Sequence, residues 1–555
     1  MGNEDAGGGG ATEAPPVLGN WSGSSYAGHA IATGTQRVVI DAGYAGETVY
    51  YIVNNTADSG RSILLPSAGP QDGLGALSGG TAGDAATTAG EPPQPRGIRG
   101  VPGMPDPRPL EPASPELRGL SGSGNATQPT WSVGDVESLE TYTKRGETVA
   151  AEVLAVQQQD PWAVYVWAER VADGPVVTSE IADVVAGRLL DAESNADIHD
   201  MVSGFLGEPW GEHGFSNLIG ASRRDLHVML YDIDGDGAPQ AGQAYVVGYF
   251  WAEQNYRGSA NERLMFYLDS ELLSDTANTI GDGDTSWSAD DAWPREAIST
   301  LAHEYQHMLH FYQRWVRRGP DAAFPTWLNE MLSLATEDLL ARELGVPGPR
   351  SVNAADGSAG GAPNTGGRLP DYIAAGPATP LTVWDNSLDD YAVSYSFGAY
   401  MLRSFGPEVL TRLMLEADPA GSPNYGEAAL AAAASVQEGA QLSFAELSRR
   451  WAVAMFTSND LDAAPRFRIN TGGWIGPDRA GGQVGSINLW NYRSAVDTGS
   501  GVLIVDGPVL LRSDRGALAL EPDSHLFATG GVLPASGGEL SFSLPEGVSV
   551  TVLTR

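Results

Sequence analysis

Three ionisable side chains within two apolar segments constrain the fold of this chain more than any other feature of its sequence. His303 and His307 stand four residues apart in a His-Glu-x-x-His pattern, and Glu330 follows in a Trp-Leu-Asn-Glu segment at 327–330. Four residues advance an α-helix by about one turn, so both imidazoles can reach one metal ion. A metal site built from these residues requires a fold that brings a second segment beside the histidine helix.

The residues around the histidines predict a regular helix with one buried face. Asp290 or Asp291 can cap its start, and Pro294 suits its first turn. Apolar side chains recur at steps of three and four residues and face away from the histidines. This stripe consists of Ile298, Leu301, Tyr305, Met308, Tyr312 and Trp315.

The third ligand separates two classes of site that share the His-Glu-x-x-His pattern. One class uses a histidine or aspartate six residues after the second histidine, following a glycine three residues after it. Gln313 and His310 stand at those positions, so the sequence excludes that class. A second helix, predicted from Phe324 to Leu344 with a proline at its start and a glycine after its end, makes Glu330 the better candidate.

Glu304 lies beside any metal that the two histidines bind, because it directly follows His303. A zinc ion held by three protein ligands keeps a fourth position for water and lowers the pKa of that water to about 7. A neighbouring carboxylate can take the water's proton. The pattern therefore predicts Glu304 as a general base.

The two segments together resemble the glutamate-ligand zincins, or gluzincins, and more narrowly the hyicolysin family of secreted bacterial neutral zinc metallopeptidases. The resemblance is carried by His303-Glu304-Tyr305-Gln306-His307 and Trp327-Leu328-Asn329-Glu330, and is strongest from about 225 to 405. It implies that His303, His307 and Glu330 are zinc ligands and that Glu304 is the general base. It also implies a zinc-dependent endopeptidase acting on protein or peptide substrates.

Tyrosine is the expected donor to the oxyanion of the tetrahedral intermediate, since no histidine other than His525 follows His310. The local form Tyr-x-x-Gly at Tyr395 is similar to the stretch that carries the catalytic tyrosine in aminopeptidase-type gluzincins. We therefore expect Tyr395 in this role, with Tyr391 second.

The sequence offers several candidates for the residue that orients a zinc-binding histidine. Thermolysin-type relatives carry an aspartate four residues after the ligand glutamate, and here Leu334 stands in that place. Asn329, Glu337 and Asp338 are the remaining candidates, and the last two could equally be solvated surface charges. His310 is expected to be a packing histidine or an orienting one, not a ligand.

The aminopeptidase signature Gly-x-Met-Glu-Asn is absent, which favours an endopeptidase. In zincins an edge strand before the metal helix pairs with extended substrate, and 244–250 is a plausible strand of this kind. The same segment could also be a core strand of the sheet.

A second metal site is suggested by Asp232, Asp234 and Asp236, whose alternating carboxylates resemble the acidic half of a calcium loop. The twelfth position of an EF-hand would be Gln243 in place of a glutamate. An acidic turn between strands is the alternative reading.

The composition of the chain restricts its binding partners and its cellular location. The chain has 555 residues, no cysteine and a net charge of −37, which excludes disulfides and disfavours nucleic acid. No apolar run reaches membrane-spanning length. The segment Met1 to Gly10 resembles the flexible tether of a bacterial lipoprotein. We therefore expect an extracellular or cell-surface monomer, which an N-terminal lipid could attach to a membrane. A disordered start of a cytosolic protein is the alternative.

The pattern along the chain predicts an α+β protein. A zincin-type catalytic domain, with a mixed sheet, the metal helix and a helical subdomain, is flanked by an N-terminal β-sandwich and a small C-terminal β-domain. The expected parts are a tether at 1–29, a β-domain at 30–170 interrupted by a Gly/Pro-rich insertion at 66–130, a catalytic subdomain at 171–345, a helical subdomain at 346–462 and a β-domain at 463–555.

Two other functions use the same residues. A non-catalytic cell-surface binding protein on a zincin scaffold would be expected to lose Glu304 or a ligand, and none is missing. A zinc hydrolase of a non-peptide bond would keep all four residues, so only its substrate distinguishes it.

Overall fold

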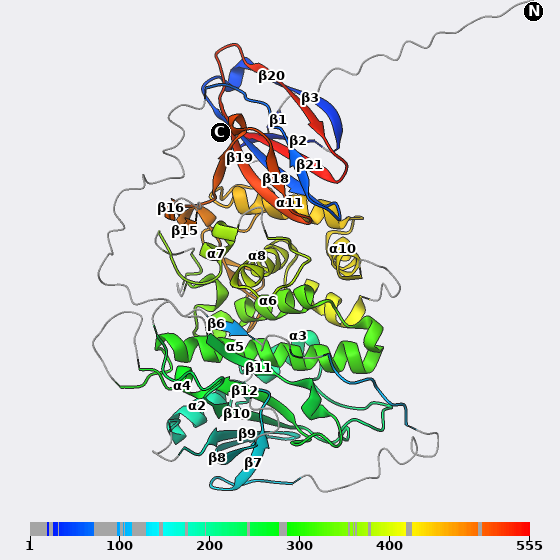
Figure 1. Ribbon diagram of the computed structural model, residues 1–555, viewed down its shortest axis with the longest axis vertical. Helices are drawn as coiled ribbons and strands as arrows, with labels where there is room; N and C mark the ends of the chain where they lie inside the picture. The colour runs from blue at the N-terminus through cyan, green and yellow to red at the C-terminus, as the bar shows by residue number, and fades with distance from the viewer. Residues whose placement is uncertain are drawn as a thin grey trace, which may run out of the picture.

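The protein has three parts stacked along its long axis (Figure 1): a mixed β-sheet at one end, a layer of helices in the middle and a second β-rich body at the other end. The computed structural model describes residues 19–20, 26–31, 33–70, 97–99, 104, 106–113, 129–143, 148–171, 176–194, 196–240, 245–276, 286–352, 356–358, 360, 363–375, 379–417, 425–497 and 502–555.

The sheet nearest the histidine helix has seven strands in the order β6-β11-β12-β10-β9-β8-β7. Its central strand β10 runs parallel to β9 and β12, whereas β11 runs antiparallel to β12. The strands are β6 (Gly97–Arg99), β7 (Val136–Glu140), β8 (Thr148–Gln159), β9 (Trp162–Glu169), β10 (Asp225–Tyr231), β11 (Tyr245–Phe250) and β12 (Leu264–Asp269).

Both faces of this sheet are buried, as the alternation of side chains along β10 illustrates. Val228 and Leu230 join the large core shared with the helices, while Met229 and Tyr231 join a second apolar cluster on the opposite face. Successive side chains of a strand point to opposite faces, so the near-continuous apolar run of β10 fits a central strand.

Helices α2 (Ser179–Leu189), α3 (Ile198–Leu206) and α5 (Ala292–His310) belong to this part of the molecule, with the short α4 (Ser270–Leu273) after β12. A break between residues 189 and 198 separates α2 from α3. Leu190 is extended, and Asp197 caps α3 by accepting a hydrogen bond from the backbone of Asp200 at 2.7 Å. A second oxygen of Asp197 accepts from Asp191, which stabilises the break.

The two helices predicted around the histidines and around Glu330 are both present. Asp291 occupies the N-cap position of α5 without a capping side-chain hydrogen bond, and α5 continues into a wider helical turn at Phe311–Val316. The second helix, α6, spans Thr326–Leu344 and ends at Gly345, whose φ of 70° is the left-handed conformation that glycine adopts readily.

The middle layer packs against the other side of α6. A β-carbon on Gly398 of α8 would lie 3.1 Å from the Met331 carbonyl oxygen, so glycine allows the two helices to approach closely. The helices of this layer are α7 (Leu369–Ala375), α8 (Leu388–Phe405), α9 (Glu408–Thr411), α10 (Tyr425–Glu438) and α11 (Phe444–Phe456). The short strands β13 (Trp474–Ile475), β14 (Val484–Gly485), β15 (Arg493–Asp497) and β16 (Val502–Asp506) follow.

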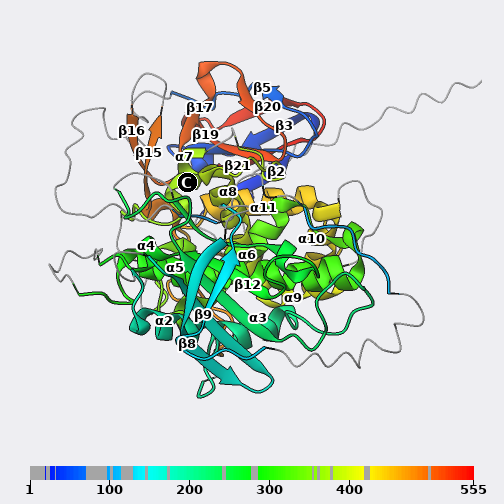
Figure 2. The same ribbon diagram turned by 60° about the horizontal axis from the view of Figure 1, so that its bottom comes forward.

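The third part joins both ends of the chain in one six-stranded sheet of order β1-β2-β21-β4-β19-β17. In Figure 2 the blue N-terminal strands and the red C-terminal strands lie together at one end. The strands are β1 (Gly19–Asn20), β2 (Ala27–Ile31), β4 (Thr48–Asn55), β17 (Leu510–Arg512), β19 (Ser524–Val532) and β21 (Val548–Thr554). The pairs β3 (Gly34–Ile40) with β20 (Gly538–Leu544) and β5 (Arg61–Ile63) with β18 (Leu518–Leu520) accompany it.

This sheet corrects the expected separation of an N-terminal β-domain at 30–170 from a C-terminal β-domain at 463–555. Strand β4 lies between β19 and β21, so strands from both ends share one sheet and one core. Strands β7 to β9, expected in the N-terminal domain, instead pair with β10 in the sheet beside the metal helix. Alternation along a strand predicts its buried face but not its distant pairing partner.

The α+β class is confirmed, while two expected segments are described only in part. Of the tether expected at 1–29, residues 27–29 belong to β2, and residues 1–18 lie outside the described residues. Most of the insertion expected at 66–130 also lies outside them, apart from short stretches that include β6. Among the helices that the structure describes, none is both long and apolar enough to cross a membrane.

Candidate metal centre

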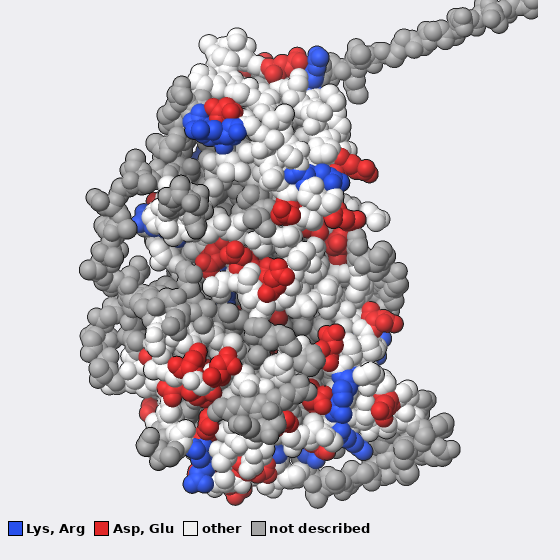
Figure 3. Space-filling view, in the orientation of Figure 1, with Lys and Arg blue, Asp and Glu red and all other residues white. Residues whose placement is uncertain are grey.

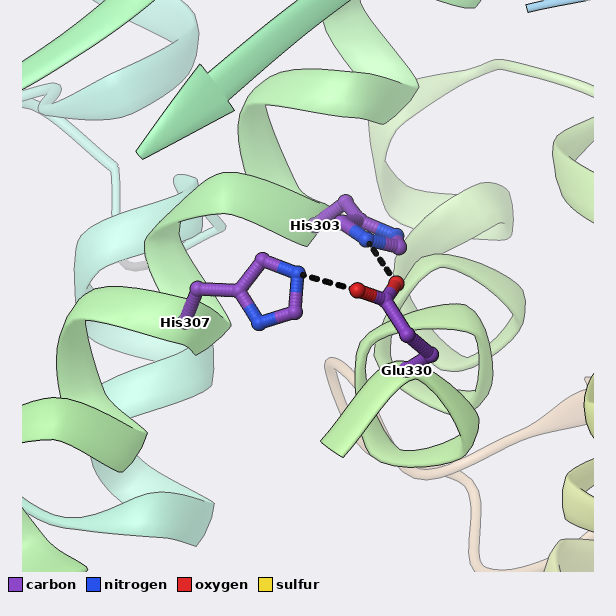
Figure 4. Close-up of side chains that lie close together, drawn as sticks. All are labelled: His303, His307 and Glu330. Atoms are coloured by element: carbon purple, nitrogen blue, oxygen red, sulfur yellow. Dashed lines mark hydrogen bonds and ion pairs between the residues drawn. The ribbon is translucent and has the colours of Figure 1, made fainter. Parts of the chain in front are cut away.

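The side chains of His303, His307 and Glu330 meet in the space between α5 and α6 (Figure 4). His303 Nε2 lies 3.0 Å from one carboxylate oxygen of Glu330, and His307 Nε2 lies 3.4 Å from the other. One potential ligand atom from each residue falls within 4.8 Å of the other two. The sequence predicted this set of three, and the fold brings it together.

The metal helix lies close to the sheet because of a glycine in β11. A β-carbon on Gly248 would lie 2.8 Å from the Tyr267 carbonyl oxygen and 3.0 Å from Thr300 Cγ2 on α5. Any larger residue would push β11 away from β12 or from α5. Strand β11 and the histidine helix are therefore held in contact one turn before His303.

Burial and charge act in opposite directions on the three residues. Burial disfavours the imidazolium of His303, but its hydrogen bonds with Glu330 and Glu337 outweigh this effect and raise its pKa to about 9. Burial likewise disfavours the carboxylate of Glu330, yet the charges of His307 and His303 lower its pKa to about 2. Without a metal, the cluster thus holds a proton between His303 and two carboxylates.

The raised pKa of His303 has a definite consequence for the metal-free protein. Its ordinary value of 6.5 is raised on folding, so this contribution to stability is fully present below pH 6.5 and is lost as the pH rises through about 9. A cation at the same position would displace this proton.

Glu337 orients His303 from the opposite side of the ring. Its Oε1 lies 2.9 Å from His303 Nδ1, and its Oε2 accepts a hydrogen bond of 2.5 Å from the Ser299 hydroxyl. Both Glu337 and His303 are almost fully buried. A carboxylate on Nδ1 fixes the tautomer that leaves Nε2 available for a metal. Glu337 therefore makes the orienting hydrogen bond that Leu334, at the position of the thermolysin-type aspartate, cannot make.

His307 is oriented by a separate polar network. The Ser333 hydroxyl lies 3.3 Å from His307 Nδ1, and it also contacts Gln306 Oε1 and the Asn329 carbonyl oxygen. Gln306 in turn donates to the Asn329 side chain at 3.4 Å. Ser333 was not among the residues predicted from the sequence, although its position three residues after Glu330 places it on the same face of α6.

Glu304 is completely buried on α5, next to the ligand set. Its negative charge is among the causes that raise the pKa of His303, which reflects the short distance between the two side chains. A buried carboxylate beside the converging nitrogens is the arrangement expected of a general base.

The two tyrosines lie in other surroundings. The Tyr395 hydroxyl donates to Asp338 at 3.2 Å, and the same carboxylate oxygen pairs with Arg403 at 2.7 Å. Asp338 lies eight residues after Glu330, or about 12 Å along the helix axis. The Tyr391 hydroxyl donates to Asn386 at 3.1 Å. Both hydroxyls are engaged in these hydrogen bonds, and the oxyanion role of Tyr395, or of Tyr391, stays a prediction.

His310 has a structural environment, in keeping with its interpretation as a packing residue. Its Nε2 accepts a hydrogen bond of 3.1 Å from the Phe324 backbone, and its ring stacks on the Phe324 ring. Burial lowers its pKa to about 3, so the ring is neutral. His310 thereby fixes the entry to α6 against the end of α5.

The acidic loop after β10 brings Asp232 and Asp236 together with Asp269, and Asp234 is not part of this group. Both oxygens of Asp269 already accept backbone hydrogen bonds, from Ile233 and Leu272. Burial raises the pKa of Asp269 to about 7. Since capping of α4 explains Asp269, calcium remains a prediction of the sequence without support from this geometry.

Two imidazoles and a carboxylate that converge between helices define the protein as a candidate α+β metalloprotein. The chain belongs to the Peptidase M30 family, whose model matches residues 143–481. This range contains the complete cluster and both helices, and it confirms the resemblance to hyicolysin-like metallopeptidases.

A curated relative supports the same family. The chain is 24% identical over 181 residues to the neutral metalloprotease ShpI of Staphylococcus hyicus. The match covers 32% of this chain and 34% of that protein, so the chain matches about a third of the relative's length.

Replacing the orienting carboxylate tests the role of Glu337. Glu337→Gln keeps all three converging side chains but weakens the hold on His303 Nδ1, so zinc affinity should fall about 10- to 100-fold. The matched control is Glu343→Gln on the same helix, whose carboxylate faces Arg342 and not the cluster. Competition with a fluorescent zinc chelator measures both affinities, and equal affinities would contradict the assignment.

Replacing the Tyr395 hydroxyl tests where this side chain acts. Tyr395→Phe removes a hydrogen bond from the buried Asp338–Arg403 pair, so unfolding should become easier by about 1 kcal/mol while kcat changes less than twofold, about the size of an indirect effect. Tyr400→Phe, also buried on α8, is the control. A fall in kcat of about 100-fold at unchanged stability would instead restore the oxyanion role.

Proposed function

We propose that this protein is a zinc-dependent endopeptidase in which His303, His307 and Glu330 hold the metal and Glu304 acts as general base. The observation that supports this most strongly is the convergence of the three donor groups within 4.8 Å. Two imidazole nitrogens and one carboxylate are the donor set of a catalytic zinc with an open fourth position. Membership of the Peptidase M30 family agrees with the reaction class.

A bound zinc ion would lower the pKa of a coordinated water and polarise the substrate carbonyl. Glu304 would take a proton from the attacking water and deliver it to the leaving amine, so that one carboxylate serves first as base and then as acid. Glu337 and Ser333 would hold the two imidazoles in the orientation that this geometry needs. Glu304 is fully buried, so its carboxylate lies away from bulk solvent.

The layout around the cluster supports a zincin-type catalytic domain. Strand β11 is antiparallel to its neighbour β12, and it contacts α5 at Gly248. The other edge of β11 pairs only with the three residues of β6. An extended peptide could use this edge through backbone hydrogen bonds, which favours cleavage inside a chain. The catalytic unit would consist of the seven-stranded sheet with α5 and α6. The helical layer from α7 to α11 would form the opposite wall of the substrate cleft.

Proteins or peptides are the proposed substrates, in an extracellular or cell-surface setting. The face in Figure 3 carries Asp and Glu side chains at many places and Lys or Arg at few, in line with the net charge of −37. Such a surface repels the phosphates of nucleic acid. The setting is inferred from the resemblance to a secreted bacterial family.

The decisive substitution is Glu304→Gln. It removes the proposed base but none of the three ligands, so cleavage of an unstructured protein such as casein should be lost while the bound zinc is retained. The wild-type protein should lose activity with a zinc chelator and regain it when zinc is restored.

Two outcomes of this experiment separate the alternatives. Cleavage that survives in Glu304→Gln would contradict the assigned base. Full zinc binding without cleavage of casein or any tested peptide by the wild-type protein would favour a binding protein or a hydrolase of a non-peptide bond.

A further inference from the structure

The strand that would bind substrate already has a partner from the same chain. β11 pairs with β12 on one side and with β6 on the other. β6 belongs to the Gly/Pro-rich stretch that precedes the strands of the sheet in sequence, and it is the outermost strand of the order β6-β11-β12-β10-β9-β8-β7.

The pairing places β6 next to the metal helix as well as next to β11. β6 runs parallel to β11, with Gly97 opposite Tyr245 and Ile98 opposite Val246. It also contacts α5, the helix that carries the two histidines, and Figure 1 draws it beside this helix. An extended segment therefore occupies the edge of the sheet that adjoins the helix carrying His303 and His307.

We propose that β6 is an internal occupant of the peptide-binding edge of β11 and that a substrate must displace it before cleavage. This inference rests on the proposed endopeptidase function, because β11 has no substrate to exclude otherwise. A backbone edge has one set of hydrogen-bonding groups, so β6 and an extended substrate cannot use the same stretch of β11 at once.

The short and irregular pairing of β6 with β11 is consistent with a strand that a substrate can displace. It has only three residues, and its register against β11 shifts between Val246 and Gly248, so Val247 has no partner in the pairing. A short pairing with a bulge contributes few hydrogen bonds. Covalent linkage compensates, because it gives such a segment an effective concentration of about millimolar at its site.

A competing internal segment predicts a specific kinetic signature. Weakening the pairing of β6 should lower KM and leave kcat unchanged, since the chemistry begins only after β6 has left. A strand that merely protects the sheet edge would behave differently. Its loss would lower stability and would not improve KM.

The first test is a pair of prolines in β6. Adjacent residues of a strand point their N–H groups to opposite sides, so Ile98→Pro with Arg99→Pro removes the group directed at β11 whichever residue carries it. We expect KM for casein to fall about tenfold, the effect of losing one or two backbone hydrogen bonds. The control is the pair Ser78→Pro and Gly79→Pro, in the same Gly/Pro-rich stretch and outside β6.

The second test locks β6 in place and does not depend on a destabilising change. Ile98→Cys with Val246→Cys creates a pair at register partners in a chain that has no other cysteine. Paired residues on neighbouring strands lie about 4.8 Å apart, within the range that a disulfide spans. Oxidation should reduce kcat/KM at least about twentyfold, and reduction with a phosphine should restore it.

The outcomes separate this inference from the proposed function. Lower KM in the proline pair, with loss and recovery of activity in the cysteine pair, would support it. A fully cross-linked protein that retains its activity, or a proline pair with the KM of the control, would overturn it while the endopeptidase stands. Absence of chelator-sensitive cleavage in every form would overturn both.

Discussion

The contact between α5 and α6 is the constraint on which the rest of the structure depends. In this contact, His303 of α5 meets two carboxylates of α6. Glu330 lies 3.0 Å from its Nε2, and Glu337 lies 2.9 Å from its Nδ1. Burying two carboxylates beside an imidazole is costly unless each charge is compensated. The cluster is compensated by a proton in the metal-free protein, and a divalent cation would serve the same purpose. Helix packing and metal binding are thus parts of one electrostatic arrangement.

The surrounding fold holds these two helices in position from both sides. Gly248 lets β11 and the sheet approach α5, and Gly398 lets α8 approach α6. His310 fixes the start of α6 to the end of α5 through the Phe324 backbone. The sheet, the metal helices and the helical layer are therefore in direct contact, and a shift of either helix would alter the geometry of the cluster.

The sequence predicted those parts of the site that depend on local spacing. His303 and His307 follow from the helical repeat, and Glu330 follows from the second predicted helix. Ser333 and Glu337 lie on the same face of α6 as Glu330, because steps of three and seven residues nearly complete whole turns. Ser333 was nevertheless not predicted, and Glu337 was one of three candidates with Asn329 and Asp338. The oxyanion role of Tyr395 was predicted from a four-residue pattern, which could not show that its hydroxyl donates a hydrogen bond to Asp338. The pairing partners of the strands could not be predicted from the sequence either, since β4 pairs with β19 and β21, which lie more than 450 residues later in the chain. Pairing over such separations depends on the whole fold.

The central claim is that His303, His307 and Glu330 together bind one metal ion. The most direct test is elemental analysis of the purified protein after dialysis against metal-free buffer, for the wild type and for Glu330→Gln, with circular dichroism to compare their folds. The account predicts about one zinc per wild-type chain and loss of this zinc in the variant at unchanged secondary structure. Retention of the full zinc content by Glu330→Gln, or a wild-type protein that takes up no zinc when it is supplied, would contradict it.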